Sequence, residues 1–119
     1  MMDGKIYSTY LMASKPYGTL YIGVTGDIIT RTTQHRDHQI AGFTKRYGVH
    51  RLVWFVYFGE IDAAIQREKT MKKWKRDWKI NLIERENPHW EDLYPNFFRV
   101  EANPAVIIGD PFFRVKGVD

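Results

Sequence analysis

The sequence predicts a single α+β domain in which three strands are interleaved with helices. Its 119 residues are 44% hydrophobic, enough for one domain with a real core. The segments 5–12, 19–24 and 52–58 either alternate apolar with polar residues or are continuously apolar, as strands do. The segments that follow the second and third strands carry helix start and stop signals.

The first two strands form a predicted hairpin. Residues 13–18 contain a proline and a glycine, which is typical of a turn. We expect Met12 to pair with Thr19 across this loop. Continuing that antiparallel register pairs Tyr10 with Tyr21 and places both phenols on one face of the sheet. A slip of one residue would separate them.

A helix should follow the hairpin. Asp27 is a natural N-cap, and the helix is expected to run to about Gln39. Residues 41–48 are interpreted as a loop. Residues 52–58 are continuously apolar, as in a strand that is covered on both faces.

Two more helices are predicted over about 61–73 and 75–86, and the second should stop before Pro88. In the first of them, Glu68 lies on the same helical stripe as Ile61 and Ile65. Burying a carboxylate is costly unless it is paired or bound to a metal. Glu68 is therefore either one half of a salt bridge or a metal ligand.

Arg31 and His35 are four residues apart and share one face of the predicted helix. A guanidinium suits phosphate oxygens, and histidine titrates near neutral pH, but a plain solvated helix face is the alternative. Tyr10 and Tyr21 form either an ordinary aromatic pair in the core or two reactive hydroxyls. A nearby metal ion or arginine would lower the pKa of such a hydroxyl and make it useful.

Positive charge is concentrated before residue 96. The net charge is +4, whereas residues 96–119 contain three basic and three acidic residues. Residues 67–79 hold seven basic residues against two acidic ones, an excess of +5. This stretch, with Trp74 and Trp78, either binds a phosphate backbone in a salt-dependent way or is a solvated face whose tryptophans anchor the helix.

The chain divides by composition into a domain at 1–95 and an extension at 96–119. The extension contains Phe-Phe-Arg-Val at 97–100, and the same four residues recur at 112–115. We expect these segments to pack on the body or to contact a partner, which leaves a monomer or a homodimer open.

Several classes of protein are disfavoured. The chain has no cysteine, so disulfides and thiolate zinc sites are excluded. It has no apolar run of about 20 residues that would span a membrane. The first residues also lack an apolar signal region, and we expect a cytoplasmic protein.

Taken together, these residues resemble the GIY-YIG nuclease superfamily, and specifically its small stand-alone bacterial members. Ser-Thr-Tyr at 8–10 and Tyr-Ile-Gly at 21–23 look like the two motifs of that family, with the family's spacing between the tyrosines. The family's arginine falls on Arg31, its partner on His35 and its metal-binding glutamate on Glu68. One departure is that the family's first Gly-Ile is replaced here by Ser-Thr.

The resemblance implies a three-stranded antiparallel sheet flanked by helices, which agrees with the elements predicted above. It also implies metal-dependent hydrolysis of DNA phosphodiester bonds with Mg²⁺ or Mn²⁺. Glu68 would hold the metal and Arg31 would neutralise charge on the phosphate. Tyr10 or Tyr21 would position or deprotonate the attacking water, assisted by His35.

The expected partner is DNA, with repair or recombination as the expected setting. The alternative is a nucleic-acid-binding module with lost or weak cleavage, suggested by the Ser-Thr replacement and by the basic stretch. A third hypothesis is a structural role centred on the Phe-Phe-Arg-Val segments. The basic residues expected to contact nucleic acid are Lys45, Arg46, Lys69, Lys72, Lys73, Lys75 and Arg76.

Overall fold

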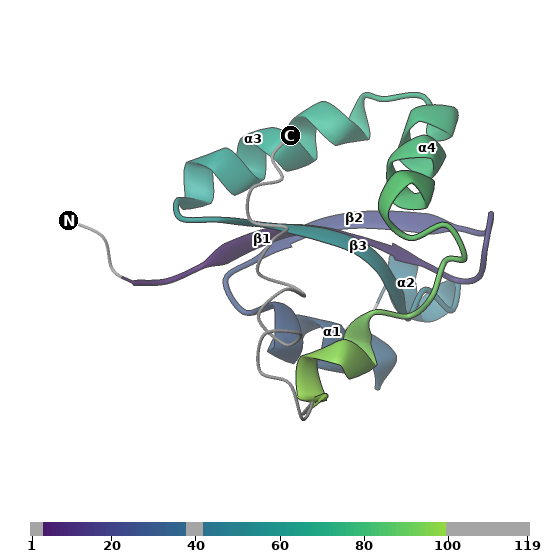
Figure 1. Cartoon of the computed structure of the whole chain (residues 1–119), viewed down its shortest axis with the longest axis horizontal. Helices are drawn as coiled ribbons and strands as arrows, with labels where there is room; N and C mark the ends of the chain where they lie inside the picture. Colours follow the sequence, from purple (N-terminus) through teal and green to yellow (C-terminus); the bar gives the residue numbers. More distant parts are fainter. Residues whose placement is uncertain (1–3, 38–41, 100–119) are drawn as a thin grey trace.

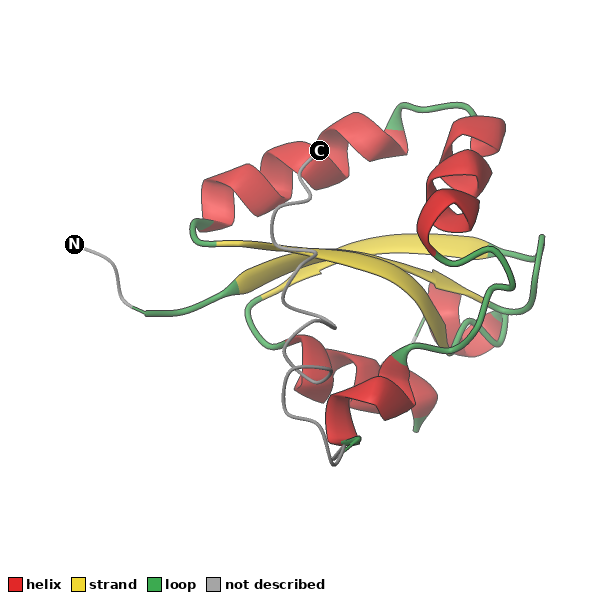
Figure 2. Cartoon of the chain, in the orientation of Figure 1, coloured by secondary structure: helices red, strands yellow, loops and turns green. Residues whose placement is uncertain are grey.

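The computed structural model describes residues 4–37 and 42–99, which form a three-stranded antiparallel sheet with helices on both faces (Figures 1 and 2). Strand β1 (Tyr7–Ala13) lies in the centre, between β2 (Leu20–Thr25) and β3 (Arg51–Phe58). This is the α+β fold predicted from the sequence. Across the described ranges, no helix is both long and apolar enough to cross a bilayer.

The helices are divided between the two faces of the sheet (Figure 1). One face carries α1 (Ile28–Arg36), the short α2 (Phe43–Arg46) and the 3₁₀ helix η1 (Tyr94–Phe98). The other face carries α3 (Ile61–Lys72) and α4 (Arg76–Glu86). The chain therefore crosses to the second face through β3 and returns to the first face between α4 and η1.

The predicted helix starts and stops are confirmed except in two segments. The carboxylate of Asp27 caps α1, because its Oδ1 accepts the amide of Thr30 at 3.1 Å. This helix ends at Arg36, with Asp37 as its C-cap, which is earlier than the predicted end near Gln39, a residue outside the described ranges. The segment 41–48 was predicted to be a loop, and this is wrong for its centre, which forms α2. One helical turn is too short to produce a periodic pattern of apolar residues.

The predicted register of the hairpin is wrong by two residues. Tyr10 lies opposite Gly23, not opposite Tyr21. The ladder continues one pair further into the loop, since the amide of Ser14 donates to the carbonyl of Thr19 at 3.0 Å. A shift of two residues preserves the face of every side chain, so both tyrosines still point to the side of α1.

Apolar side chains form a core on each face of the sheet. One core lies between the sheet and the helices α3 and α4, and the other lies under α1 and η1. Strand β3 contributes to both cores although it is an edge strand, which confirms that it is covered on both faces. The first core includes Leu11, Val53, Met71, Ile83 and Trp90, and the second includes Tyr10, Met12, Ile28, Leu52 and Phe55.

The predicted apolar stripe of α3 is wrong. Ile61 is 46% exposed, and the buried side chains of this helix are Ala64 and Met71. Glu68 lies between these two residues along the helix and is only partly buried. The helix is rotated relative to the expectation, because Ala64 and Met71, rather than Ile61, are the side chains buried against the sheet.

The segment after α4 covers the open edge of β3. The buried side chain of Asn87 donates to the carbonyls of Val53 at 3.1 Å and Glu91 at 2.9 Å, and accepts the amide of Glu91 at 3.0 Å. The amide of Leu93 then donates to the carbonyl of Leu52 at 2.8 Å. Backbone groups that would otherwise lie unpaired at a sheet edge are thereby satisfied.

The described part of the C-terminal segment packs on the body. The ring of Phe97 lies 5.4 Å from that of Phe55, and the hydroxyls of Tyr94 and Thr33 are 2.6 Å apart. The second Phe-Phe-Arg-Val, at 112–115, lies outside the described residues. The proposed boundary at 95/96 stays a prediction.

We predict that Asn87→Ala lowers the free energy of unfolding by about 2–3 kcal/mol, because it removes several hydrogen bonds and leaves buried backbone groups unpaired. Asn81→Ala makes the same change on an exposed residue of α4 and should cost no more than about 0.5 kcal/mol. Urea unfolding of both variants measures this difference. Equal stability of the two variants would contradict the role of Asn87.

Candidate active site

Three buried side chains form a chain of hydrogen bonds between β1, α1 and α2. The hydroxyl of Tyr10 is 3.0 Å from Nε2 of His35, and Nδ1 of His35 is 3.1 Å from the hydroxyl of Thr44. Tyr10 is 2% exposed and His35 is 3% exposed. Because these groups are shielded from water, each of them depends on the next for its hydrogen bond.

Burial keeps Tyr10 and His35, the two titratable residues of this hydrogen-bonded group, neutral. The pKa of Tyr10 is raised far above its ordinary value, first by burial and then by the neighbouring Tyr21. Burial, assisted by the charge of Arg31, lowers the pKa of His35 to about 4. A neutral imidazole carries a single N–H, so one ring nitrogen of His35 donates a hydrogen bond while the other accepts one.

The ring of Tyr10 reaches His35 by passing over Gly23, its partner in the ladder. A Cβ atom at position 23 would lie 2.5 Å from both Cζ and Oη of Tyr10. Any side chain there would collide with the end of the phenol. The glycine of the second motif is thus required by close packing of the tyrosine of the first motif.

Tyr21 and Arg31 complete the group on this face. The ring of Tyr21 lies 6.2 Å from that of Tyr10 and 5.4 Å from that of His35. Tyr21 is less buried than Tyr10. The positive charge of Arg31 acts on the pKa values of both Tyr10 and His35, in each case favouring the less protonated form. Four of the five predicted site residues are therefore together.

The fifth residue, Glu68, belongs to α3, which lies on the opposite face of the sheet. Its charge still reaches Tyr10, whose pKa it raises. The Glu68 side chain is 18% exposed, and its carboxylate is 2.9 Å from Nζ of Lys72. The salt bridge considered from the sequence is thus present, one turn along the same helix.

The donor set around Glu68 suits a hard cation that keeps most of its water. In residues 4–37 and 42–99, no cluster of three or more His, Cys, Asp or Glu side chains is placed to bind a metal. Mg²⁺ is commonly held by one or two carboxylates and several waters, so a single partly exposed carboxylate fits it. The same donor set does not suit a structural zinc ion, which needs four protein ligands.

The replacement in the first motif forms a contact of its own. The hydroxyl of Thr9, which is fully buried, donates to the carbonyl of Ala64 at 2.8 Å. Ala64 lies four residues before Glu68, the position whose carbonyl accepts the Glu68 amide in an α-helix. Thr9 therefore ties the strand that carries Tyr10 to the helical turn that carries Glu68.

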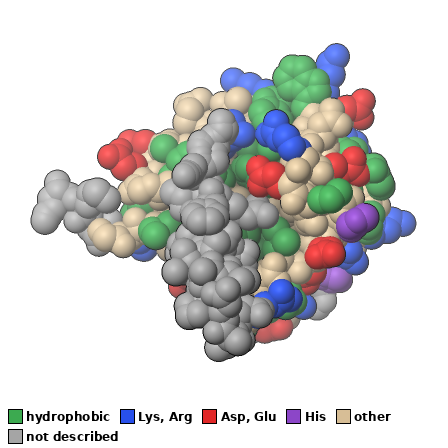
Figure 3. All heavy atoms as spheres, in the orientation of Figure 1, with side chains coloured by type: hydrophobic (Ala, Val, Ile, Leu, Met, Phe, Trp, Pro, Cys, Tyr) green, Lys and Arg blue, Asp and Glu red, His purple; other side chains and the backbone are tan. Residues whose placement is uncertain are grey.

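The predicted nucleic-acid contacts lie on both sides of the sheet. Lys45 and Arg46 belong to α2, on the face of the tyrosines. The basic residues of 67–79 lie on α3, α4 and the turn between them, where Figure 3 shows basic and acidic side chains interspersed. The guanidinium of Arg76 donates to two carbonyls of the β1–β2 loop, at 2.7 and 2.6 Å, and so holds that loop.

The two tryptophans of the basic stretch differ. Trp74 packs against the core between the sheet and α3, and the guanidinium of Arg67 lies 5.4 Å from its ring centre. Trp78 is 56% exposed. The anchoring interpretation therefore holds for Trp74 only.

Sequence reasoning named the two basic residues of α2 but missed the other contacts that this helix makes at the site. Thr44 is the hydrogen-bond partner of His35, and Phe43 lies 6.3 Å from the ring of Tyr21. The segment 41–48 was interpreted as a loop, so no pattern pointed to a buried threonine. The only available signal was the run of aromatic and basic residues at 43–47.

Comparison with known proteins gives two findings. A model of the GIY-YIG catalytic domain matches residues 6–81, which include all five predicted catalytic residues. Among solved structures, the chain is similar to the UPF0213 protein BH0048 from Bacillus halodurans, with 25% identity, a TM-score of 0.47, and coverage of 73% of this chain and 92% of that one. No curated protein matches the chain.

We predict that Gly23→Ala destabilises the protein by about 1–3 kcal/mol, because the added methyl group forces the buried Tyr10 ring away from His35. Gly26→Ala is the matched control. Its Cβ would meet first, at 3.0 Å, the flexible end of Lys5. Thermal unfolding distinguishes the two variants, and an unchanged Gly23→Ala protein would contradict the close approach.

We also predict that His35 makes the fold sensitive to acid. Its pKa is about 4 in the folded protein and 6.5 in an unfolded chain, so the unfolded state takes up a proton first as the pH falls. Stability is complete above pH 6.5, and up to about 3 kcal/mol is lost by pH 4.

The measurement is the free energy of unfolding against pH for the wild type, His35→Asn and the exposed-site control His89→Asn. The His35 variant should lose the part of the pH dependence that lies between pH 6.5 and 4, and the His89 variant should keep it. Identical pH profiles for the wild type and His35→Asn would refute a neutral buried His35.

Proposed function

Because this chain belongs to the GIY-YIG family, a nuclease family, we propose that it hydrolyses DNA phosphodiester bonds with the help of a divalent metal ion. The observation that best supports this is the hydrogen bond between Tyr10 and His35, formed beside Tyr21 and Arg31. It joins a hydroxyl to a neutral imidazole, and the charges of Arg31 and Glu68 both act on that hydroxyl.

Glu68 is the residue proposed to hold the metal, Mg²⁺ or Mn²⁺. Such an ion, when bound, supplies positive charge that polarises the scissile phosphate and stabilises the leaving oxygen. Lys72 now pairs with Glu68, but its side chain is 58% exposed. Ion pairs of this kind contribute only about 0.2–1 kcal/mol, so the pair is a weak competitor for a divalent cation.

Arg31 is proposed to bind the phosphate that is cleaved. Among the residues that the structure describes, Arg31 forms no ion pair, so its charge is available to a ligand. A guanidinium fork matches two phosphate oxygens and neutralises the charge that builds on them. Because the charge of Arg31 lowers the pKa of His35, a phosphate bound to Arg31 would also change the electrostatics of the Tyr10–His35 pair.

Tyr10 and His35 are proposed to handle the proton of the attacking water. In this proposal the Tyr10 hydroxyl donates to Nε2 of His35, which is 3.0 Å away, and the Tyr10 oxygen keeps a lone pair for an incoming O–H donor. A proton can then pass from water to Tyr10 while the Tyr10 proton moves to His35. The raised pKa keeps Tyr10 protonated at neutral pH, so Tyr10 accepts a proton only as it passes its own proton to the histidine. Tyr21, the less buried phenol, is proposed to position the water or the phosphate.

The basic side chains of α2, α3 and α4 are proposed to hold the DNA backbone, which would make binding fall with increasing salt. Repair or recombination stays a prediction for the biological setting.

A second candidate is a DNA-binding module that has lost cleavage. The Glu68–Lys72 pair favours it, because that carboxylate already has a cationic partner. The Ser-Thr replacement before Tyr10 favours it as well. This candidate requires salt-sensitive binding that is indifferent to the metal ion.

We predict that Glu68→Gln abolishes Mg²⁺- or Mn²⁺-dependent cleavage of DNA, and that Tyr10→Phe slows it by about 10²–10⁴-fold, the usual contribution of general acid–base catalysis. Glu60→Gln is the control, because Glu60 is an exposed carboxylate that precedes the same helix. Single-stranded, duplex and branched DNA should each be tested.

Cleavage that is undiminished in Glu68→Gln would contradict the proposed metal ligand. Salt-sensitive binding by a wild type that cleaves none of these DNAs would support the second candidate instead.

A further inference from the structure

Helix α2 presents two half-exposed aromatic rings beside the proposed site. Phe43 is 48% exposed and Tyr47 is 49% exposed, and their ring centres are 4.8 Å apart. The Phe43 ring is in turn 6.3 Å from that of Tyr21. A row of aromatic faces therefore leads from the site to the surface.

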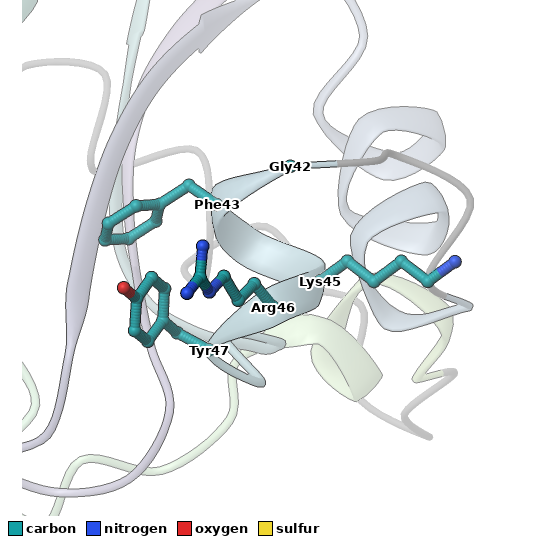
Figure 4. Close-up of a pocket in the computed structure, with 5 residues that line it drawn as sticks. All are labelled: Gly42, Phe43, Lys45, Arg46 and Tyr47. Atoms are coloured by element: carbon teal, nitrogen blue, oxygen red, sulfur yellow. The ribbon is translucent and has the colours of Figure 1, made fainter.

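The rings are accompanied by positive charge. The guanidinium of Arg46 lies 5.6 Å from the centre of the Tyr47 ring, and in Figure 4 it extends toward the two aromatic rings. Lys45 extends the other way in the same view. The hollow at this place is lined by Gly42, Phe43, Lys45, Arg46 and Tyr47.

Phe43 and Tyr47 flank a segment of α2 that buried hydrogen bonds hold in place. Thr44, which lies between them in the chain, is 4% exposed and forms the hydrogen bond to His35. Its carbonyl accepts the amide of Val49 at 2.9 Å. The platform of Phe43 and Tyr47 is thus held in a set position relative to the Tyr10–His35 pair, while about half of each of the two residues stays in contact with water.

Exposed aromatic faces beside a cation are the chemistry of nucleobase stacking with phosphate neutralisation. A base inside a duplex has both of its faces covered by neighbouring base pairs, whereas an unpaired base has faces to offer. We propose that Phe43 and Tyr47 stack an unpaired nucleobase of DNA, with Arg46 on its phosphate, next to the phosphodiester at Arg31. The inference rests on the proposed function for its choice of DNA.

The inference names a substrate class: DNA with unpaired nucleotides at the cleavage site, such as a single strand, a flap or a branch. The test is fluorescence anisotropy in EDTA, so that nothing is cleaved. The probes are an oligothymidine of about 12 nucleotides, within the range bound by small single-strand-binding folds, a fully abasic strand of equal length, and a duplex.

Phe43→Leu and Tyr47→Leu keep an apolar side chain but remove the aromatic face. Each should weaken oligothymidine binding by about five- to a hundredfold and leave abasic-strand and duplex binding unchanged. Trp78→Leu is the control, because Trp78 is an equally exposed aromatic residue on α4, across the sheet. Circular dichroism and thermal unfolding confirm that each variant is folded.

Unchanged oligothymidine binding in both folded variants overturns the inference, as does an equal loss for the abasic strand or an equal loss in Trp78→Leu. Cleavage of duplex DNA by a wild type that binds oligothymidine no better than the abasic strand overturns the inference and leaves the proposed function standing. Failure of the wild type to bind any of the three probes overturns both.

Discussion

The hydrogen bond from Tyr10 to His35 is the constraint on which the rest of this face depends. To form it, the phenol of the central strand must cross the neighbouring strand, which is possible only because Gly23 has no side chain. His35 must in turn be neutral, and it must direct its second nitrogen to Thr44. One contact therefore determines the packing of β2, the position of α1 and the position of α2.

The same arrangement would let a small domain assemble the proposed site from both faces of a sheet. Tyr10, Tyr21, Arg31 and His35 lie on the side of α1, while Glu68 comes from the helix on the other side. Thr9 makes a buried hydrogen bond to Ala64, one turn before Glu68. Because Thr9 and Tyr10 are neighbours on one strand, the two halves of the site share a rigid support.

The elements with strong local signals were predictable from the sequence, and those set by tertiary packing were not. The cap at Asp27 and the stop before Pro88 depend on short-range chemistry, and both are present. The face shared by the tyrosines follows from strand periodicity, but the exact pairing depends on how many loop residues continue the ladder. The apolar stripe predicted for α3 was wrong, because Ala64 and Met71, not Ile61, are buried against the sheet.

Thr44 and the other residues of α2 had no periodic signal, and the Glu68–Lys72 pair was one of two open alternatives. The most direct test of the account is the protonation and tautomer of His35, read from ¹⁵N chemical shifts of the labelled imidazole in the intact protein at neutral pH. The account predicts a neutral ring with its proton on Nδ1 and a bare Nε2 that accepts the Tyr10 hydroxyl. In Tyr10→Phe that single-tautomer signature should be lost. An imidazolium at neutral pH, or a proton on Nε2 of the wild type, would contradict it.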